Sequence, residues 1–247
     1  MSFEIQDKIA LVTGANRGIG KSIVESFIKH GAKKVYLAVR DLEKTTELVA
    51  KFADRVVPVY VDLAKPESII ELAKVAADVQ IVVNNAGILK LANPLADDVE
   101  EVFNQELTIN TFGLIRMAKA FVPVLEKNAG GAFVQLNSVA SVRNFVDFTT
   151  YSASKAAAYS ITQGLRDSVA NKGIAVLSVH PGPISTDMAN DAGMGDMAEP
   201  ASLVSEGIVN ALKAGDFHLF PDSIAQNIWE AYQSFASAVI EAPTPED

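Results

Sequence analysis

The sequence contains no cysteine and only one tryptophan, and its charge is one-sided. The lack of cysteine excludes disulfides, thiolate catalysis and cysteine-ligated zinc. There are 21 lysines and arginines against 30 acidic residues, a formal net charge of −9. This balance argues against binding to nucleic acid or to an anionic membrane, because both require clustered cations.

Long apolar runs are also lacking. No stretch approaches the roughly 18 residues of a membrane span. Residues 1–7 show neither the cationic segment nor the apolar run of a signal peptide. Together these absences predict a soluble cytoplasmic protein.

The composition is that of a globular chain, with 49% apolar and 21% charged residues. The length of 247 residues suits one domain, and the sequence contains no internal repeat and no low-complexity linker. We therefore expect a single domain over residues 1–247, ending in a loose acidic tail over residues 241–247.

Apolar runs alternate with segments of helical period along the chain. Strands are predicted at residues 9–13, 35–39, 56–61, 81–83, 132–136, 174–179 and 217–220. Helices are predicted at residues 21–30, 42–52, 152–172, 201–213 and 223–240, with one or two long helices over residues 99–127 and one more beginning at Pro66. Continuously apolar strands separated by helices predict an α/β fold, a Rossmann-type doubly wound parallel sheet of about seven strands. Pro58 favours an edge position for its strand.

A glycine-rich turn follows the first predicted strand and opens directly into a helix. It contains Gly14, Gly18 and Gly20, with the spacing G-x-x-x-G-x-G. Such a turn lets a pyrophosphate approach backbone N–H groups at a helix N-terminus. The alternative is a turn that serves only helix–strand packing.

Charged residues at the end of the second predicted strand bear on the choice of cofactor. An NAD enzyme is expected to place an acid here for the ribose 2′-hydroxyl, and Asp41 lies one or two positions too late. Arg40 instead suits a 2′-phosphate, and Arg17 in the glycine turn would face it from the other side. The alternative is two solvated arginines.

Three polar residues are candidates for the chemistry. Ser138 follows the fifth predicted strand, Tyr151 precedes a helix that is expected to begin near Ser152, and Lys155 lies four residues after Tyr151. Residues i and i+4 share a helix face, so the lysine is expected to lower the pKa of the phenol. Ser138 would hold the substrate oxygen against the tyrosine hydroxyl. The alternatives are a packed aromatic residue and a solvated lysine.

These residues, together with Asn110 and the Asn84–Gly87 and Pro181–Gly182 segments, resemble the short-chain dehydrogenases/reductases over roughly residues 5 to 190. The resemblance implies that Tyr151 is the general acid/base and that Ser138 positions the carbonyl. It implies that Lys155 holds the nicotinamide ribose and that Asn110 holds a water in the proton relay.

The resemblance also implies a set of cofactor-binding residues that includes Tyr151 and Lys155. The others are Gly14, Asn16, Arg17, Gly18, Ile19, Gly20, Arg40, Asp62, Leu63, Asn84, Ala86, Gly87, Pro181, Gly182, Ile184 and Thr186. Val39 stands where NAD-dependent members carry an acid and Arg40 follows it, which resembles the NADP-preferring, carbonyl-reductase-like branch.

A homo-oligomer is expected from the same resemblance. The family's common tetramer is one form. A dimer built on two long helices, around residues 108–127 and 152–170, is the other. The region of residues 217–222 departs from the sequence that many members carry around the last strand.

Methionines and aromatic residues suggest the nature of the substrate. Residues 187–199 contain Met188, Met194 and Met197 between glycines, a composition that suits a mobile apolar lid or a surface loop. The segment 145–148 would wall the same pocket or pack in the core. The three histidines lack metal-ligand spacing, so we expect no metal site.

The sequence thus favours an NADP(H)-dependent oxidoreductase that interconverts a small to medium apolar ketone or aldehyde and its alcohol. The alternatives are a dinucleotide-binding sensor without turnover and an epimerase or dehydratase on the same scaffold.

Overall fold

The computed structural model describes residues 2–242. Its strands are β1 (Ile9–Thr13), β2 (Lys34–Val39), β3 (Val56–Tyr60), β4 (Ile81–Asn84), β5 (Gly131–Leu136), β6 (Ile174–Val179) and β7 (His218–Leu219). Its α-helices are α1 (Gly18–Lys29), α2 (Thr46–Phe52), α3 (Pro66–Val75), α4 (Val99–Glu106), α5 (Gly113–Lys127), α6 (Thr149–Ser168), α7 (Asp187–Asp191), α8 (Ala201–Ala214) and α9 (Ser223–Phe235).

All seven strands form one parallel sheet in the order β3-β2-β1-β4-β5-β6-β7. The doubly wound α/β fold that the sequence predicts is therefore confirmed. Strand β3, which contains Pro58, lies at the edge of the sheet, as expected for a residue that lacks the N–H donor. The chain order reverses between β1 and β4, and ligands of such sheets bind at that point, beyond the carboxyl ends of the strands.

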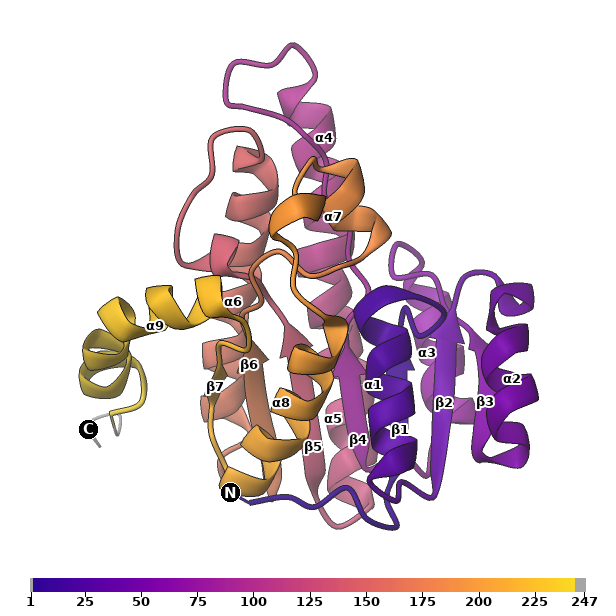
Figure 1. The fold of residues 1–247 in the computed structure, drawn as a ribbon. Coiled ribbons are helices and arrows are strands. Elements are labelled where there is room, and N and C mark those ends of the chain that lie inside the picture. The colour runs from indigo at the N-terminus through magenta and orange to yellow at the C-terminus, as the bar shows by residue number, and fades with distance from the viewer. Residues whose placement is uncertain (1, 243–247) are drawn as a thin grey trace.

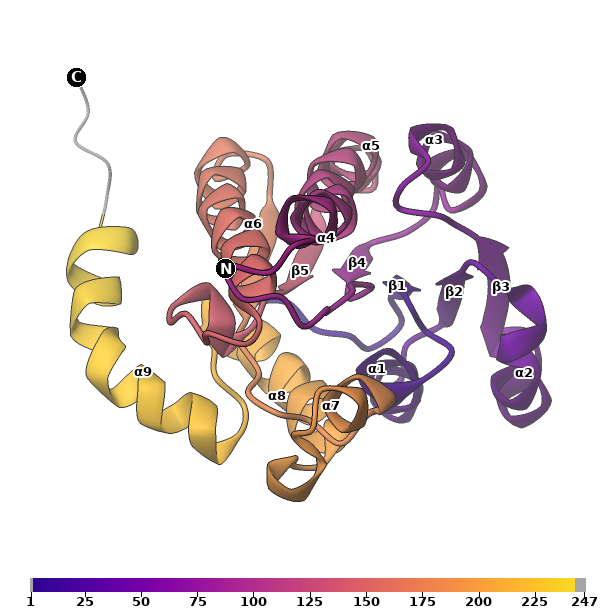
Figure 2. The ribbon, with the colours of Figure 1, turned by 90° about the horizontal axis from the view of Figure 1, so that it is seen from above.

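Helices cover both faces of the sheet, as Figures 1 and 2 show. On one face, α1, α2 and α8 pack through residues such as Phe27, Leu48 and Ile208. On the other face, α3, α5 and α6 pack through residues such as Phe121 and Ala158. Because successive strand residues point to opposite faces, each buried strand contributes to both of these clusters.

One helix begins earlier than the sequence predicts, and the helical stretch that carries Asn110 contains an irregular turn. Helix α6 begins at Thr149, so Tyr151 lies within its first turn rather than ahead of it. The stretch 99–127, expected to form one or two long helices, forms α4 and α5 with a π-helical segment, Leu107–Phe112, between them. π-Helical turns inside α-helices often mark functional sites, and this one carries Asn110.

Helix α9 lies outside the two helical layers (Figure 2). Asp222 caps its N-terminus by accepting a hydrogen bond from Ala225 N at 3.0 Å. Its Trp229 stacks on Phe220 with ring centroids 4.9 Å apart. Within the predicted acidic tail, Glu241 Oε1 lies 2.6 Å from Nδ1 of the buried His218, a hydrogen-bond distance. The rest of that tail, residues 243–247, lies outside the described residues.

No helix in the described part of the chain has the length and apolar composition needed to span a membrane.

Candidate active site

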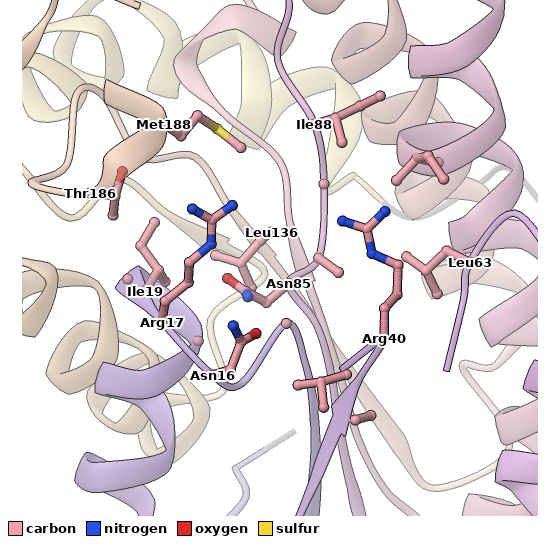
Figure 3. A pocket seen from close by; sticks show the side chains of 18 of the residues that line it. Asn16, Arg17, Ile19, Arg40, Leu63, Asn85, Ile88, Leu136, Thr186 and Met188 are labelled. Carbon is pink, nitrogen blue, oxygen red and sulfur yellow. The ribbon is translucent and has the colours of Figure 1, made fainter. Parts of the chain in front are cut away.

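A cleft of about 480 Å³ opens beyond the carboxyl ends of the central strands. It extends from the glycine turn and the end of β2 to Tyr151 and Lys155 on α6. Figure 3 shows its wall, with Asn16 and Arg17 on one side and Arg40 and Leu63 on the other. The cleft therefore occupies the place where the fold predicts a dinucleotide.

The glycine turn has a backbone that requires glycine. Gly14 and Gly18 have φ of +65° and +52°, a region that side chains rarely adopt. A Cβ at Gly20 would lie 2.1 Å from Gly14 O. Helix α1 has no side-chain cap and no acidic residue in its first turn, which leaves its N-terminal N–H groups available to an anion.

Asn85 fastens the loop after β4 to the glycine turn. Its side chain donates to Thr13 O at 2.8 Å, and the Thr13 hydroxyl accepts hydrogen bonds of 2.9 Å from the N–H groups of Asn85 and Ala86. These bonds join the carboxyl ends of β1 and β4, so the floor of the cleft is held at the switch point of the sheet.

Three cations gather where the adenosine end of a dinucleotide would lie. Arg17, Arg40 and Lys44 line the cleft, and the guanidinium groups of the two arginines point into it from opposite sides (Figure 3). Arg17 pairs with Asp187 at 2.5 Å, with both side chains 65% exposed. Such an exposed pair is weak, so a phosphate can compete for the guanidinium.

The carboxylate of Asp41 caps a short helix. Its carboxylate accepts a hydrogen bond of 3.1 Å from Glu43 N and so caps the short 3₁₀ helix Leu42–Thr45. Asp41 lines the cleft, but its Oδ1 already accepts this hydrogen bond.

The structure brings the four predicted catalytic residues together. The Ser138 hydroxyl lies close enough to Tyr151 to lower the pKa of its phenol. A Cβ on Gly87 would lie 3.0 Å from Asn110 Oδ1 and 3.6 Å from Lys155 Nζ, so these two groups flank the same backbone. Tyr151 and Lys155 are 8% and 5% exposed, at the end of the cleft opposite Arg40.

The pKa values of this pair differ from the expectation. Burial raises the pKa of Tyr151 to about 12, although the hydrogen bond from Ser138 lowers it. Burial lowers the pKa of Lys155 to about 8. The ammonium does not lower the pKa of the phenol here, because it donates to Leu136 O at 2.7 Å and lies 5.7 Å from the ring centroid of Tyr151. The phenol is consequently protonated at neutral pH.

Asn110, which lies in the π-helical segment, makes hydrogen bonds to the loop after β4. Its side chain accepts from Ile88 N at 3.0 Å and donates to Ile88 O at 2.9 Å and to Ser154 Oγ at 3.0 Å. Gly87 and Ile88 line the cleft, so Asn110 fixes a stretch of its wall.

Most of the predicted cofactor-binding residues line the cleft, but Asn84, Gly182 and Ile184 do not. Asn84 is buried and donates to Gln135 Oε1. Gly182 N donates to Asp222 Oδ2 at 2.7 Å, and Ile184 is 3% exposed. These three residues pack next to the cleft and do not form its surface.

Sequence reasoning missed several lining residues. They are Ala38, Val39, Lys44, Val61, Asn85, Ile88, Ile109, Leu136 and Asn137. Their common signal is position, since most lie at the end of a strand or within a few residues after it.

The segment predicted as a lid, residues 187–199, contains α7 and a short 3₁₀ turn. Met188 lines the cleft and points toward it (Figure 3). The segment 145–148, expected to wall the pocket or to pack in the core, contributes no lining residue to the cleft: Val146 is exposed, and Phe145 packs in part against the cluster under α9. Lid movement stays a prediction.

A buried histidine, His180, lies next to the backbone carbonyl of Ser138. His180 is fully buried, with its ring nitrogens 2.8 Å from Ser141 Oγ and 2.7 Å from Ser178 Oγ. It stacks on Phe220 and its Nδ1 lies 3.3 Å from Ser138 O. Burial lowers the pKa of His180 to about 3, so the folded protein holds the ring neutral.

We expect His180 to make the fold acid-sensitive. The unfolded chain takes up this proton near pH 6.5, whereas the folded chain resists it down to about pH 3. The free energy of unfolding is therefore unaffected by this group above pH 6.5. It decreases as the pH drops below 6.5, and the loss due to His180 is about 2 kcal/mol at pH 5. Urea unfolding at pH 7.5 and 5.0 measures the loss. His180→Asn should reduce the loss by that amount, and an equal pH dependence in both proteins would refute the assignment.

Comparison with known proteins agrees with this geometry. Residues 8–196 match the family model described as short chain dehydrogenase. An uncharacterized oxidoreductase of Staphylococcus saprophyticus is 32% identical over 200 residues, which cover 78% of this chain and 85% of the relative.

Solved structures share the whole fold. A short chain dehydrogenase from Burkholderia cenocepacia in complex with NADP superimposes with a TM-score of 0.86 at 31% identity, covering 98% of this chain and 100% of that one. A short chain dehydrogenase/reductase from Burkholderia phymatum in complex with NAD gives 0.84 at 20% identity, covering 99% of each chain; at that identity the likeness concerns the fold alone.

The parallel sheet, the glycine turn and the cleft at the switch point are the features of a dinucleotide-binding α/β fold. The chain belongs to the short-chain dehydrogenase family, whose members use nicotinamide dinucleotides.

Proposed function

We propose that this protein is an NADP(H)-dependent reductase of small to medium apolar ketones or aldehydes, able to oxidise the corresponding alcohols in reverse. The observation that carries the proposal is one cleft lined by three cations and by Tyr151 and Lys155, with the Ser138 hydroxyl close enough to Tyr151 to lower the pKa of its phenol. The NADP-bound relative from B. cenocepacia supports the choice of cofactor.

The residues present fit such a cofactor. The N-terminus of α1 has no side-chain cap, so its N–H groups are available to a pyrophosphate; Gly18 lets Thr186 pack against the turn, since a Cβ there would lie 2.9 Å from Thr186 Cγ2. Arg17 and Arg40 offer planar donors for a 2′-phosphate, with Lys44 beside them. Among the described residues that line the cleft at this end, Asp41 is a helix cap and Asp62 Oδ1 accepts from Ala64 N at 3.0 Å.

A bound nicotinamide dinucleotide supplies the hydride. The protein's own groups handle the proton and the orientation of the substrate. Ser138 holds the carbonyl oxygen, and Tyr151, protonated at neutral pH, donates the proton from its hydroxyl. Lys155 provides a positive charge beside the alkoxide that develops. The apolar Met188 and Ile88 on the walls favour an apolar substrate.

A panel of ketones and aldehydes, assayed with NADPH and with NADH by loss of nicotinamide absorbance, tests the proposal. We expect turnover of apolar carbonyls and faster turnover with NADPH at limiting cofactor. Tightly retained cofactor without net redox change would instead indicate an epimerase or dehydratase. Binding without any turnover would indicate a sensor. The homo-oligomer and the cellular location stay predictions.

A further inference from the structure

A buried carboxyl lies one helical turn before Asn110. Glu106 ends α4, is 0% exposed, and accepts a hydrogen bond of 2.9 Å from Lys90 N through Oε1. Asn110 holds Ile88 on the same loop. The two side chains thus fix alternate residues of the loop that lines the cleft after β4.

The other carboxyl oxygen faces the catalytic helix without a full partner. Glu106 Oε2 and Thr150 Oγ1 are both enclosed, and neither makes a hydrogen bond of ordinary geometry within the described residues. Thr150 is close enough to lower the pKa of the carboxyl, and it immediately precedes Tyr151. Burying a carboxyl with an unsatisfied oxygen destabilises a fold, so its position beside the catalytic groups suggests a role there.

Few charges face this carboxyl. Lys90 on the loop and Lys155 on α6 both lower the pKa of Glu106, but burial is the larger effect and raises it. In return, the carboxylate raises the pKa of Lys155 and of Tyr151. Lys155 forms no ion pair with an acid in residues 2–242.

We propose that Glu106 is a positioning residue of the active site: it anchors the loop after β4 through Lys90 N–H and supplies the negative charge that keeps the buried Lys155 ammonium protonated beside Tyr151. The catalytic significance of this charge rests on the proposed function, whereas the burial of Glu106 and its hydrogen bond with Lys90 N do not. Without it, burial alone would favour a neutral amine, which cannot stabilise a developing alkoxide.

Titration of Lys155 in protein labelled with ¹³C at the lysine side chains, followed by NMR, tests the proposal without substrate. In the parent protein one lysine should titrate near pH 8, and Lys155→Met should remove that signal. Glu106→Gln keeps an acceptor for Lys90 N but removes the charge, so the pKa of Lys155 should fall by roughly half to one unit. Glu101→Gln, the same change at an exposed position of α4, should leave it unchanged.

An unchanged Lys155 titration in Glu106→Gln overturns the proposal. If that variant does not fold, Glu106→Met removes the charge without burying a polar group and should give the same downward shift, and an unshifted signal there is equally decisive. Kinetics separate the two hypotheses. If the parent protein reduces no carbonyl, the proposed function fails whatever the titration shows. If it does, the alkaline limb of its pH profile should move to lower pH in Glu106→Gln, because the charge also acts on Tyr151.

Discussion

Replacing Tyr151 by phenylalanine is expected to lower kcat for carbonyl reduction by roughly 100- to 10,000-fold, the usual contribution of a positioned general acid. The variant loses only the hydroxyl that Ser138 contacts and keeps the packing of a side chain that is 8% exposed. The affinity for NADPH should change by less than about threefold, because the cations and the glycine turn are untouched. Steady-state rates and calorimetric titration measure the two quantities.

Tyr159→Phe is the matched control. Tyr159 lies two turns further along α6, where its hydroxyl bonds to His218 Nε2 at 2.7 Å, away from the cleft. This variant should keep most of the turnover. Wild-type rates in Tyr151→Phe, or an equal loss in both variants, would show that the phenol of Tyr151 is not the proton donor.

Arg40→Asp is expected to reverse the choice of cofactor. The parent protein should bind NADPH more tightly than NADH, because guanidinium groups from two elements face the cleft at the adenosine end. The substitution removes a charge-assisted partner and adds a carboxylate suited to a ribose hydroxyl. The ratio of the two dissociation constants should change on the order of 100-fold, measured by titration with each dinucleotide.

Lys213→Asp controls for the change in net charge. Lys213 lies in the last turn of α8 and is exposed at the edge of the sheet opposite the cleft. It should leave the ratio unaltered. Equal affinity for both dinucleotides in the parent protein would contradict the assignment of Arg40 before any variant is made.

The fold was accessible from the sequence because continuous apolar runs and helical periods are local signals. The position of the site followed from topology, since polar residues just after parallel strands meet at one edge. The direction in which each side chain points was harder to predict from the sequence. Asn84 and Asn85 look equivalent in the sequence, yet the first bonds to Gln135 within the sheet and only the second lines the cleft.

The pKa values of the site and the first residue of helix α6 could not be predicted from the sequence either. Helix α6 begins without a side-chain cap, so nothing in the local sequence marked Thr149 as its start. The pKa of Tyr151 depends on burial created by distant segments. Glu106 lies on a helix with two other acids in its first turn, and only tertiary packing distinguishes it from a solvated glutamate.

A structure of the protein with NADPH tests the central claim most directly. We expect the pyrophosphate over the turn from Gly14 to Gly20, the 2′-phosphate between Arg17 and Arg40, and the nicotinamide beside Tyr151 and Lys155. A dinucleotide bound outside this cleft, or one whose nicotinamide lies away from Tyr151, would contradict the account.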